Sequence, residues 1–84
     1  MAEWISVKDR LPNKNERYLC CYDLYPFGSK SIGIYYFAKN LRKVDKYDFP
    51  NENRKGWYGS DSEYGYYEKT NVTHWMPLPE LPKE

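Results

Sequence analysis

The sequence predicts a mostly β protein: a small single domain, residues 1–84, formed by one antiparallel sheet of four to five strands. Three observations support this fold class. Several segments of strand length alternate in residue character, as strands with two different faces do. Proline, glycine and polar residues separate these segments, as expected for turns. No segment is long enough for an ordinary helix, and only one short helical turn is expected.

Composition indicates a folded chain whose core consists mainly of rings. The chain has three Trp, ten Tyr and three Phe, whereas Leu, Ile and Val together supply only twelve residues. A buried aromatic ring can remove about 150–250 Å² from water. The net charge is only +1, so the self-repulsion that accompanies disorder is absent. A Trp lies beside prolines near each end, which indicates that both ends are docked against the domain.

The first predicted element is a short strand at residues 3–7. Its residues alternate, so Trp4 and Ile5 would lie on opposite faces. A polar turn follows this strand, and Pro12 in that turn disfavours a helical conformation for the residue before it.

Two longer strands are predicted next, at residues 17–25 and 31–38, joined by a turn as an antiparallel hairpin. In the first strand, Tyr18 and Cys20 share one face. Gly33 lies inside the second strand, where it indicates either a bulge or a close approach by another backbone or ring.

Residues 39–55 are interpreted as a long charged loop with one helical turn near residues 40–46. Six cations and three carboxylates give this loop a local net charge of +3. The sequence therefore predicts an irregular, basic segment between two strands.

The C-terminal part is predicted to contain a short strand at 56–59 and a last strand at 71–76. An acidic, Tyr-rich stretch lies between them, and its residues 61–68 carry a net charge of −3. Residues 77–84 are expected to form an extended, proline-rich tail.

The predicted core combines residues of the hairpin with the three tryptophans: Trp4, Leu19, Cys21, Ile32, Ile34, Trp57 and Trp75. Cys20 and Cys21 are adjacent and would point to opposite faces, so we interpret them as two reduced thiols, one of them buried. One His is too few for a typical zinc site, so no metal and no cofactor is expected.

The sequence does not predict an enzyme. His74, the only histidine, is interpreted as a hydrogen-bonded structural residue rather than a base. Nothing in the spacing pairs it with either cysteine. Asp61 and Glu63 would share a strand face, but a solvated acidic loop is the preferred interpretation.

Binding of a nucleic acid or nucleotide is a better hypothesis, because such sites need cations for phosphates and rings for bases. Residues 39–58 offer both, and the candidate binding residues are Arg42, Lys43, Lys46, Tyr47, Trp57 and Tyr58. The overall charge of +1 and the neighbouring acidic stretch count against a dedicated nucleic-acid-binding surface.

Protein binding is the other hypothesis. The chain has more tyrosines than a small core can hide, and Tyr and Trp are common in interface hot spots. A sheet edge could pair with a second copy and form a homo-oligomer. The proline-rich tail could bind an aromatic groove or pack along the domain's own Trp residues.

Both end segments resemble the family catalogued as domain of unknown function 551, found in phages, prophages and their bacterial hosts. The opening motifs are Trp-Ile-Ser-Val at residues 4–7 and Arg-Leu-Pro at 10–12. The closing motif is Thr-His-Trp-Met-Pro-Leu-Pro at 73–79. Between them lie an Ile-Gly-Tyr-Tyr-like strand at 32–37 and a Gly-Trp at 56–57, so the resemblance covers the whole chain.

The resemblance implies a setting rather than a chemistry, because the family has no assigned activity. This chain departs from the family in a longer charged loop and in an acidic insert at 61–67. The implied setting is a phage or prophage accessory protein in the cytoplasm of a bacterial host. No signal peptide and no apolar run of about 18 residues is seen, so no membrane association is expected.

We therefore expect a non-enzymatic protein that binds a host protein or a nucleotide signal. The alternative is a nucleic-acid-binding module that uses the basic and aromatic segment 39–58.

Overall fold

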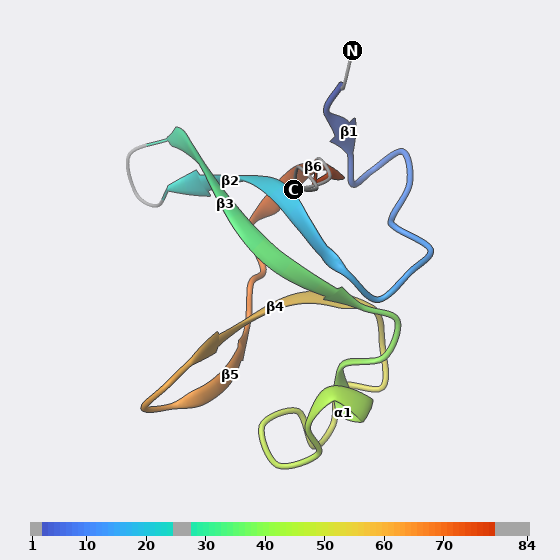
Figure 1. Cartoon of the computed structure of the whole chain (residues 1–84), viewed down its shortest axis with the longest axis vertical. Helices are drawn as coiled ribbons and strands as arrows, with labels where there is room; N and C mark the ends of the chain where they lie inside the picture. Colours follow the sequence, from blue (N-terminus) through green and yellow to red (C-terminus); the bar gives the residue numbers. More distant parts are fainter. Residues whose placement is uncertain (1–2, 25–27, 79–84) are drawn as a thin grey trace, which may run out of the picture.

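A long central hairpin organises the sheet of this protein (Figure 1). The computed structural model describes residues 3–24 and 28–78. In chain order its elements are β1 (Ile5–Ser6), β2 (Arg17–Leu24), β3 (Ser29–Ala38), α1 (Leu41–Val44), β4 (Gly56–Asp61), β5 (Gly65–Glu68) and β6 (Val72–Pro77). The six strands lie in the order β1-β6-β2-β3-β4-β5, and every pair is antiparallel. The predicted fold class is confirmed, with one strand more than predicted.

The chain ends dock by pairing with each other. β6 lies between β1 and β2, with Ile5 opposite Trp75 and Ser6 opposite His74. The indole Nε1 of Trp75 donates a hydrogen bond to the Arg10 carbonyl oxygen (3.0 Å), which holds the turn after β1 against the sheet. The predicted docking is therefore confirmed for β1 and for β6 with Trp75, whereas Trp4 itself is 40% exposed.

The acidic, Tyr-rich stretch forms the strand that was not predicted, β5. Asp61 closes the turn before it, because its Oδ1 accepts the backbone N–H groups of Glu63 (2.7 Å) and Tyr64 (3.2 Å). Gly65 follows with φ +83°, a conformation that side chains disfavour. Local turn chemistry, rather than apolar alternation, produces the β4–β5 hairpin.

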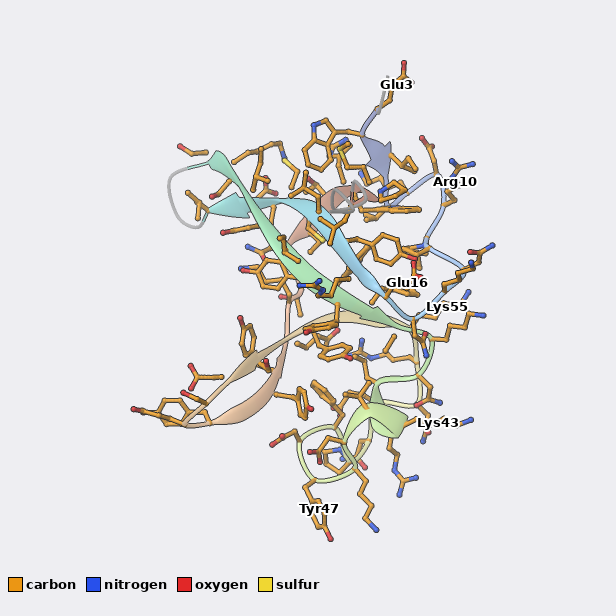
Figure 2. All side chains as sticks on the ribbon, viewed as in Figure 1. Glu3, Arg10, Glu16, Lys43, Tyr47 and Lys55 are labelled. Carbon is orange, nitrogen blue, oxygen red and sulfur yellow. The ribbon has the colours of Figure 1, made fainter. Side chains whose placement is uncertain are left out.

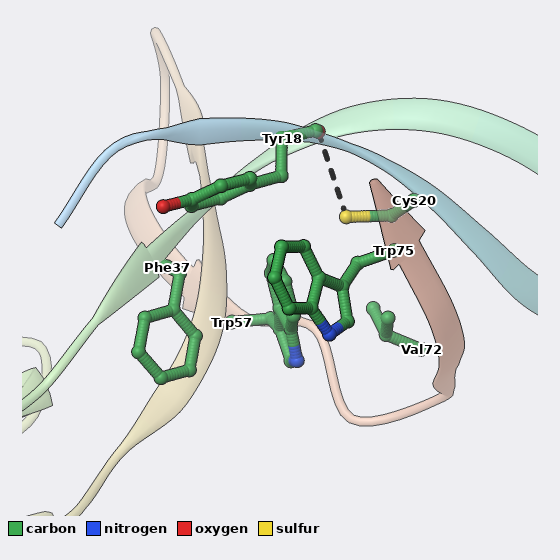
Figure 3. Close-up of a cluster of buried hydrophobic side chains, with 6 residues drawn as sticks. All are labelled: Tyr18, Cys20, Phe37, Trp57, Val72 and Trp75. Atoms are coloured by element: carbon green, nitrogen blue, oxygen red, sulfur yellow. Dashed lines mark hydrogen bonds between the residues drawn. The ribbon is translucent and has the colours of Figure 1, made fainter. Parts of the chain in front are cut away.

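One face of the sheet carries a core of rings (Figure 3). Its buried residues come from four strands and are Tyr18, Cys20, Phe37, Trp57, Val72 and Trp75. Tyr18 packs edge-on against both Trp57 (5.9 Å between ring centroids) and Trp75 (5.1 Å), a favourable arrangement for aromatic quadrupoles. Ile5 and Val7 pack against this core from the N-terminal segment. We refer to this cluster as the ring core.

The opposite face carries a second, smaller core beneath α1. Ala38, Leu41 and Phe49 are buried there, and Val44 and Tyr58 pack against them. Leu41 is the only buried residue of the four-residue helix, so it anchors the helix to the sheet. In Figure 1, α1 and the loop after it lie at the β4–β5 end of the molecule. They therefore cover only part of this face.

Hydrogen bonds tie the charged loop after β3 to the rest of the fold. The backbone N–H groups of Leu41 and Arg42 donate to the carbonyl oxygens of Arg54 (2.9 Å) and Glu52 (3.1 Å), which satisfies donors at the helix start. The Arg54 guanidinium also binds both carboxylate oxygens of Glu68 at 2.6 Å. The segment predicted as a long charged loop with one helical turn is thus fastened to β5.

The predicted core was only partly right. Trp57 and Trp75 are buried, but Leu19 and Cys21 are half-buried, and Trp4, Ile32 and Ile34 are exposed. The four hairpin residues of the predicted core share a face, but it is the face opposite to that of Trp57 and Trp75. Alternation within a strand does not say which face turns inward. The inward face of β2 carries Tyr18, because the Trp rings of β4 and β6 pack there.

Gly33 makes room for two rings. A Cβ at this position would lie 3.1 Å from the Tyr35 ring and 3.3 Å from the Tyr22 ring. Those rings meet edge-on, and the Lys69 Nζ lies 3.9 Å from the Tyr22 centroid and 5.0 Å from that of Tyr35. Of the two predicted explanations for Gly33, the close approach of rings is confirmed. The irregularity in pairing lies between β2 and β6 instead, after Cys21.

The predicted tail is only partly described. β6 ends at Pro77, and residues 79–84 lie outside the described residues, as does Tyr25 at the predicted end of the second strand. Within the described ranges, no helix has the length and apolar character needed to span a membrane.

Candidate binding surfaces

The structure separates the cations of the predicted site from two of its rings. Arg42 and Lys43 lie on α1, and Lys46 and Tyr47 lie in the loop that follows; all four are exposed. Figure 2 shows Lys43 and Tyr47 projecting outward, at the end of the molecule opposite Glu3. We call Arg42, Lys43, Lys46 and Tyr47 the cationic tip.

Trp57 and Tyr58, the other two predicted residues, are built into the two cores. Trp57 belongs to the ring core and is 6% exposed. Tyr58 lies on the other face, stacked on Tyr36 at 5.2 Å between ring centroids, and burial raises the pKa of its hydroxyl. Tyr47, which is 83% exposed, is therefore the one ring of the predicted set that stands in solvent beside the cations.

The cationic tip keeps its positive charge. Among the described residues, none of its three cations makes an ion pair. The nearby carboxylates of Asp45 and Asp48 accept backbone N–H groups of the loop and of β5 instead. The Arg42 Nε donates to the Pro50 carbonyl oxygen (3.0 Å), which holds the side chain against the loop. The tip can therefore attract an anion, with one ring available for stacking.

A second surface is the part of the sheet that α1 leaves uncovered. Strands β6, β2 and β3 place Met76 beside Leu19 and Leu19 beside Ile34, while Cys21 lies beside Ile32. Ile32 is 59% exposed and Ile34 is 51% exposed. We call Leu19, Cys21, Ile32, Ile34 and Met76 the open face. The sequence analysis had already grouped the hairpin residues of the open face, but it predicted that they form part of the core.

Polar and aromatic residues border the open face. At one end of the hairpin Arg17 lies opposite Tyr36, and at the other end Asp23 lies opposite Lys30. The Lys30 Nζ pairs with Asp23 Oδ1 at 2.7 Å, and the hydrogen bond with Asp23 raises the pKa of Lys30. Trp4, 40% exposed, precedes β1 at the lateral margin. An apolar centre with charged ends is the general pattern of a protein interface.

The two cysteines occupy different environments. Cys20 is completely buried, and burial raises the pKa of its thiol to about 12, so it stays protonated near neutral pH. Cys21 is half-buried on the open face, opposite His74 in the register. The prediction of two free thiols, one buried, is confirmed.

His74 Nδ1 lies 2.9 Å from Thr73 Oγ1, and the described residues contain no cluster of three metal-binding side chains.

A cleft of about 330 Å³ opens between the turn after β1 and the start of β6. Lys8, Lys30, Thr73 and His74 supply its polar lining. Three of these polar groups already have partners: Lys30 pairs with Asp23, the Thr73 hydroxyl donates to the Cys21 carbonyl oxygen, and His74 Nδ1 lies beside the Thr73 hydroxyl. The cleft is therefore less distinctive as a site than the open face.

These features define a small antiparallel β domain with an aromatic core. The chain belongs to the family described as Protein of unknown function (DUF551), whose family model matches residues 3–83. The resemblance seen in the end motifs is thereby confirmed. No curated protein and no solved structure matches the chain.

Proposed function

We propose that this protein is a non-enzymatic binding protein that contacts a protein partner through the open face. The proposal depends on one observation: Ile32 and Ile34 are more than half exposed in the middle of an apolar sheet surface. Contiguous exposed apolar patches mark interaction sites, because covering them removes apolar area from water at about 25 cal/mol per Å².

The margins of the open face support a protein partner. Tyr36 (39% exposed) and Trp4 (40% exposed) are residue types that contribute strongly to protein interfaces. The charged residues lie at the ends, where a partner can leave them in water. The centre carries no cation, so the surface suits an apolar protein surface better than a phosphate group.

The resemblance supports the biological setting of this proposal, a phage or prophage accessory protein in the bacterial cytoplasm. Of the two partners that this setting implies, a host protein fits the open face and a nucleotide signal does not. By analogy with small phage proteins that bind and block a host factor, a host protein is the proposed partner.

The double substitution Ile32→Glu and Ile34→Glu should abolish partner binding, because it places two carboxylates in the apolar centre. The matched control is Leu24→Glu, which changes a 41% exposed residue on the opposite face of β2. Each tagged variant would be incubated with nuclease-treated bacterial lysate, and the captured proteins identified by mass spectrometry. A partner retained by the double variant as strongly as by the control would contradict the proposal.

A second candidate function is binding of a nucleotide or nucleic acid at the cationic tip. Three cations without an ion pair beside the exposed ring of Tyr47 favour it. The burial of Trp57 leaves this surface with fewer stacking rings than the sequence predicted.

For this second candidate, Arg42→Glu with Lys43→Glu should abolish binding of a labelled oligonucleotide at low salt. Lys8→Glu with Lys14→Glu is the matched control, because it changes the net charge equally at other exposed positions. Binding should also weaken steeply with added salt, as phosphate contacts do. Fluorescence anisotropy measures both effects, and an unmutated protein that does not bind would end this hypothesis.

A further inference from the structure

We propose that the partner seated on the open face is a second copy of this chain, in a face-to-face twofold dimer. The inference rests on the proposed function, because it names the protein that the open face binds. Antiparallel sheets commonly pack face to face, about 10 Å apart. A host protein that uses this face would then have to displace the second copy.

The topology favours pairing through the face rather than through an edge. The edge strands of the sheet are β1 and β5, which are two and four residues long. Such short edges offer few unpaired backbone groups to another chain. Pairing through an edge, which the sequence analysis considered, would therefore form few backbone hydrogen bonds. The open face spans three longer strands.

The size of the open face limits the area that a dimer can bury. β6, β2 and β3 are six, eight and ten residues long, so they span about 14 Å by 20–33 Å at the usual strand spacings. This is on the order of 400 Å² in plan, whereas a standard interface buries about 800 Å² per partner. The marginal residues Trp4 and Tyr36 must therefore contribute. We expect a weak dimer, with a dissociation constant of about 1–100 μM.

The ends of the open face are complementary to each other under a twofold axis. In a face-to-face dimer the twofold axis lies between the two sheets. An axis that runs across the strands at the centre of β2, near Cys20, maps each end of the hairpin onto the other. Along β2, Arg17 precedes this centre by three residues and Asp23 follows it by three. Arg17 of one copy would therefore lie over Asp23 of the other, where it would be a second cation beside the carboxylate that pairs with Lys30.

The same axis maps the two ends of β3 onto each other. Tyr36 and Lys30 are the register partners of Arg17 and Asp23, so they lie at opposite ends of the face. Tyr36 of one copy would lie over Lys30 of the other, where an ammonium group and a ring attract each other. Near the axis, Ile34 of one copy would lie over Ile32 of the other, and Leu19 over Cys21. Both ends are thus complementary to a second copy.

Sedimentation velocity from about 5 to 500 μM tests the proposal. The unmutated protein should move from the chain mass of 10.2 kDa towards twice that mass as its concentration rises. The variant with Ile32→Glu and Ile34→Glu should stay monomeric throughout, and Leu24→Glu should dimerise normally. An unmutated protein that is monomeric at 500 μM, or a double variant that still dimerises, would overturn the proposal.

Charge variants at the ends keep the test independent of the folding of the double variant. Arg17→Asp removes two symmetry-related ion pairs, so it should raise the dissociation constant about two- to thirtyfold. Combining it with Asp23→Arg should restore dimerisation, because the charges are exchanged. Failure of the exchange to restore it would overturn the twofold arrangement.

Cys21 provides a geometric readout. It lies one residue from the proposed axis, and the other thiol, Cys20, is fully buried. The second copy should therefore cover Cys21, so its reaction with a maleimide should slow as the protein concentration rises through the dimerisation range. The variant with Ile32→Glu and Ile34→Glu should show no such slowing. A Cys21 that reacts equally fast in monomer and dimer would overturn the arrangement.

The two proposals can fail separately. Suppose that the unmutated protein is monomeric, and that a lysate protein binds it and the Leu24→Glu control but not the variant with Ile32→Glu and Ile34→Glu. The second-copy assignment then fails and the proposed function stands. If the open-face variant changes neither the oligomeric state nor the captured proteins, both fail.

Discussion

Replacing Trp75 with alanine is expected to lower the free energy of unfolding by about 3–5 kcal/mol, the usual cost of deleting a buried large ring. Trp75 is 6% exposed, and its ring centroid lies 5.1 Å from that of Tyr18 and 6.4 Å from that of Trp57. Its removal therefore leaves a cavity inside the ring core. Small domains have a total stability of about 5–15 kcal/mol. Urea denaturation followed by circular dichroism measures the loss.

Two further variants separate the contributions of Trp75. Trp75→Phe keeps a ring but removes the Nε1 donor to the Arg10 carbonyl, so we expect a smaller loss of about 1–3 kcal/mol. Trp4→Ala should cost only about 1 kcal/mol, because Trp4 is 40% exposed. The sequence analysis placed both Trp4 and Trp75 in the predicted core. Equal losses for the two alanine variants would contradict the ring core described here.

Replacing Leu41 with alanine is expected to lower the free energy of unfolding by about 2–5 kcal/mol. Leu41 has no exposed surface and is the only buried residue of α1. Its loss should loosen the helix and the cationic tip before the central hairpin, since the hairpin has its own core. Hydrogen exchange should therefore accelerate first in residues 41–55. Val44→Ala is the control, because Val44 is only half-buried and should cost less.

Gly56 gives an internal check on this contact. A Cβ at Gly56 would lie 2.6 Å from Leu41 Cδ1, so Gly56→Ala alone should destabilise the protein. In the Leu41→Ala background that carbon is gone, and the added methyl group should be tolerated or even stabilising. A double-mutant cycle should thus show a favourable interaction energy of about 0.5–3 kcal/mol. Additive effects would mean that the two residues do not touch.

The sequence predicted the elements that depend on local patterns. The strands of the central hairpin and β6 were predicted within a few residues, because each has six or more residues with clear alternation. β5 was missed, since its tyrosines occupy both faces and hide the alternation. The cations of the predicted site do lie together, because they are neighbours along α1 and its loop. Trp57 does not lie with these cations. Adjacent side chains of a strand point to opposite faces, and that of Trp57 points into the ring core.

The sequence by itself determined the fold class, the family and, within each strand, the residues that share a face. Alternation and end motifs are local properties of the chain, so they can be read without knowledge of long-range contacts. Only the tertiary structure decided which face became the ring core and which stayed open. Tyr18 faces inward because Trp57 and Trp75, distant in sequence, reach the same side of β2. The other side keeps Ile32 and Ile34 exposed, because α1 covers only its β4 end.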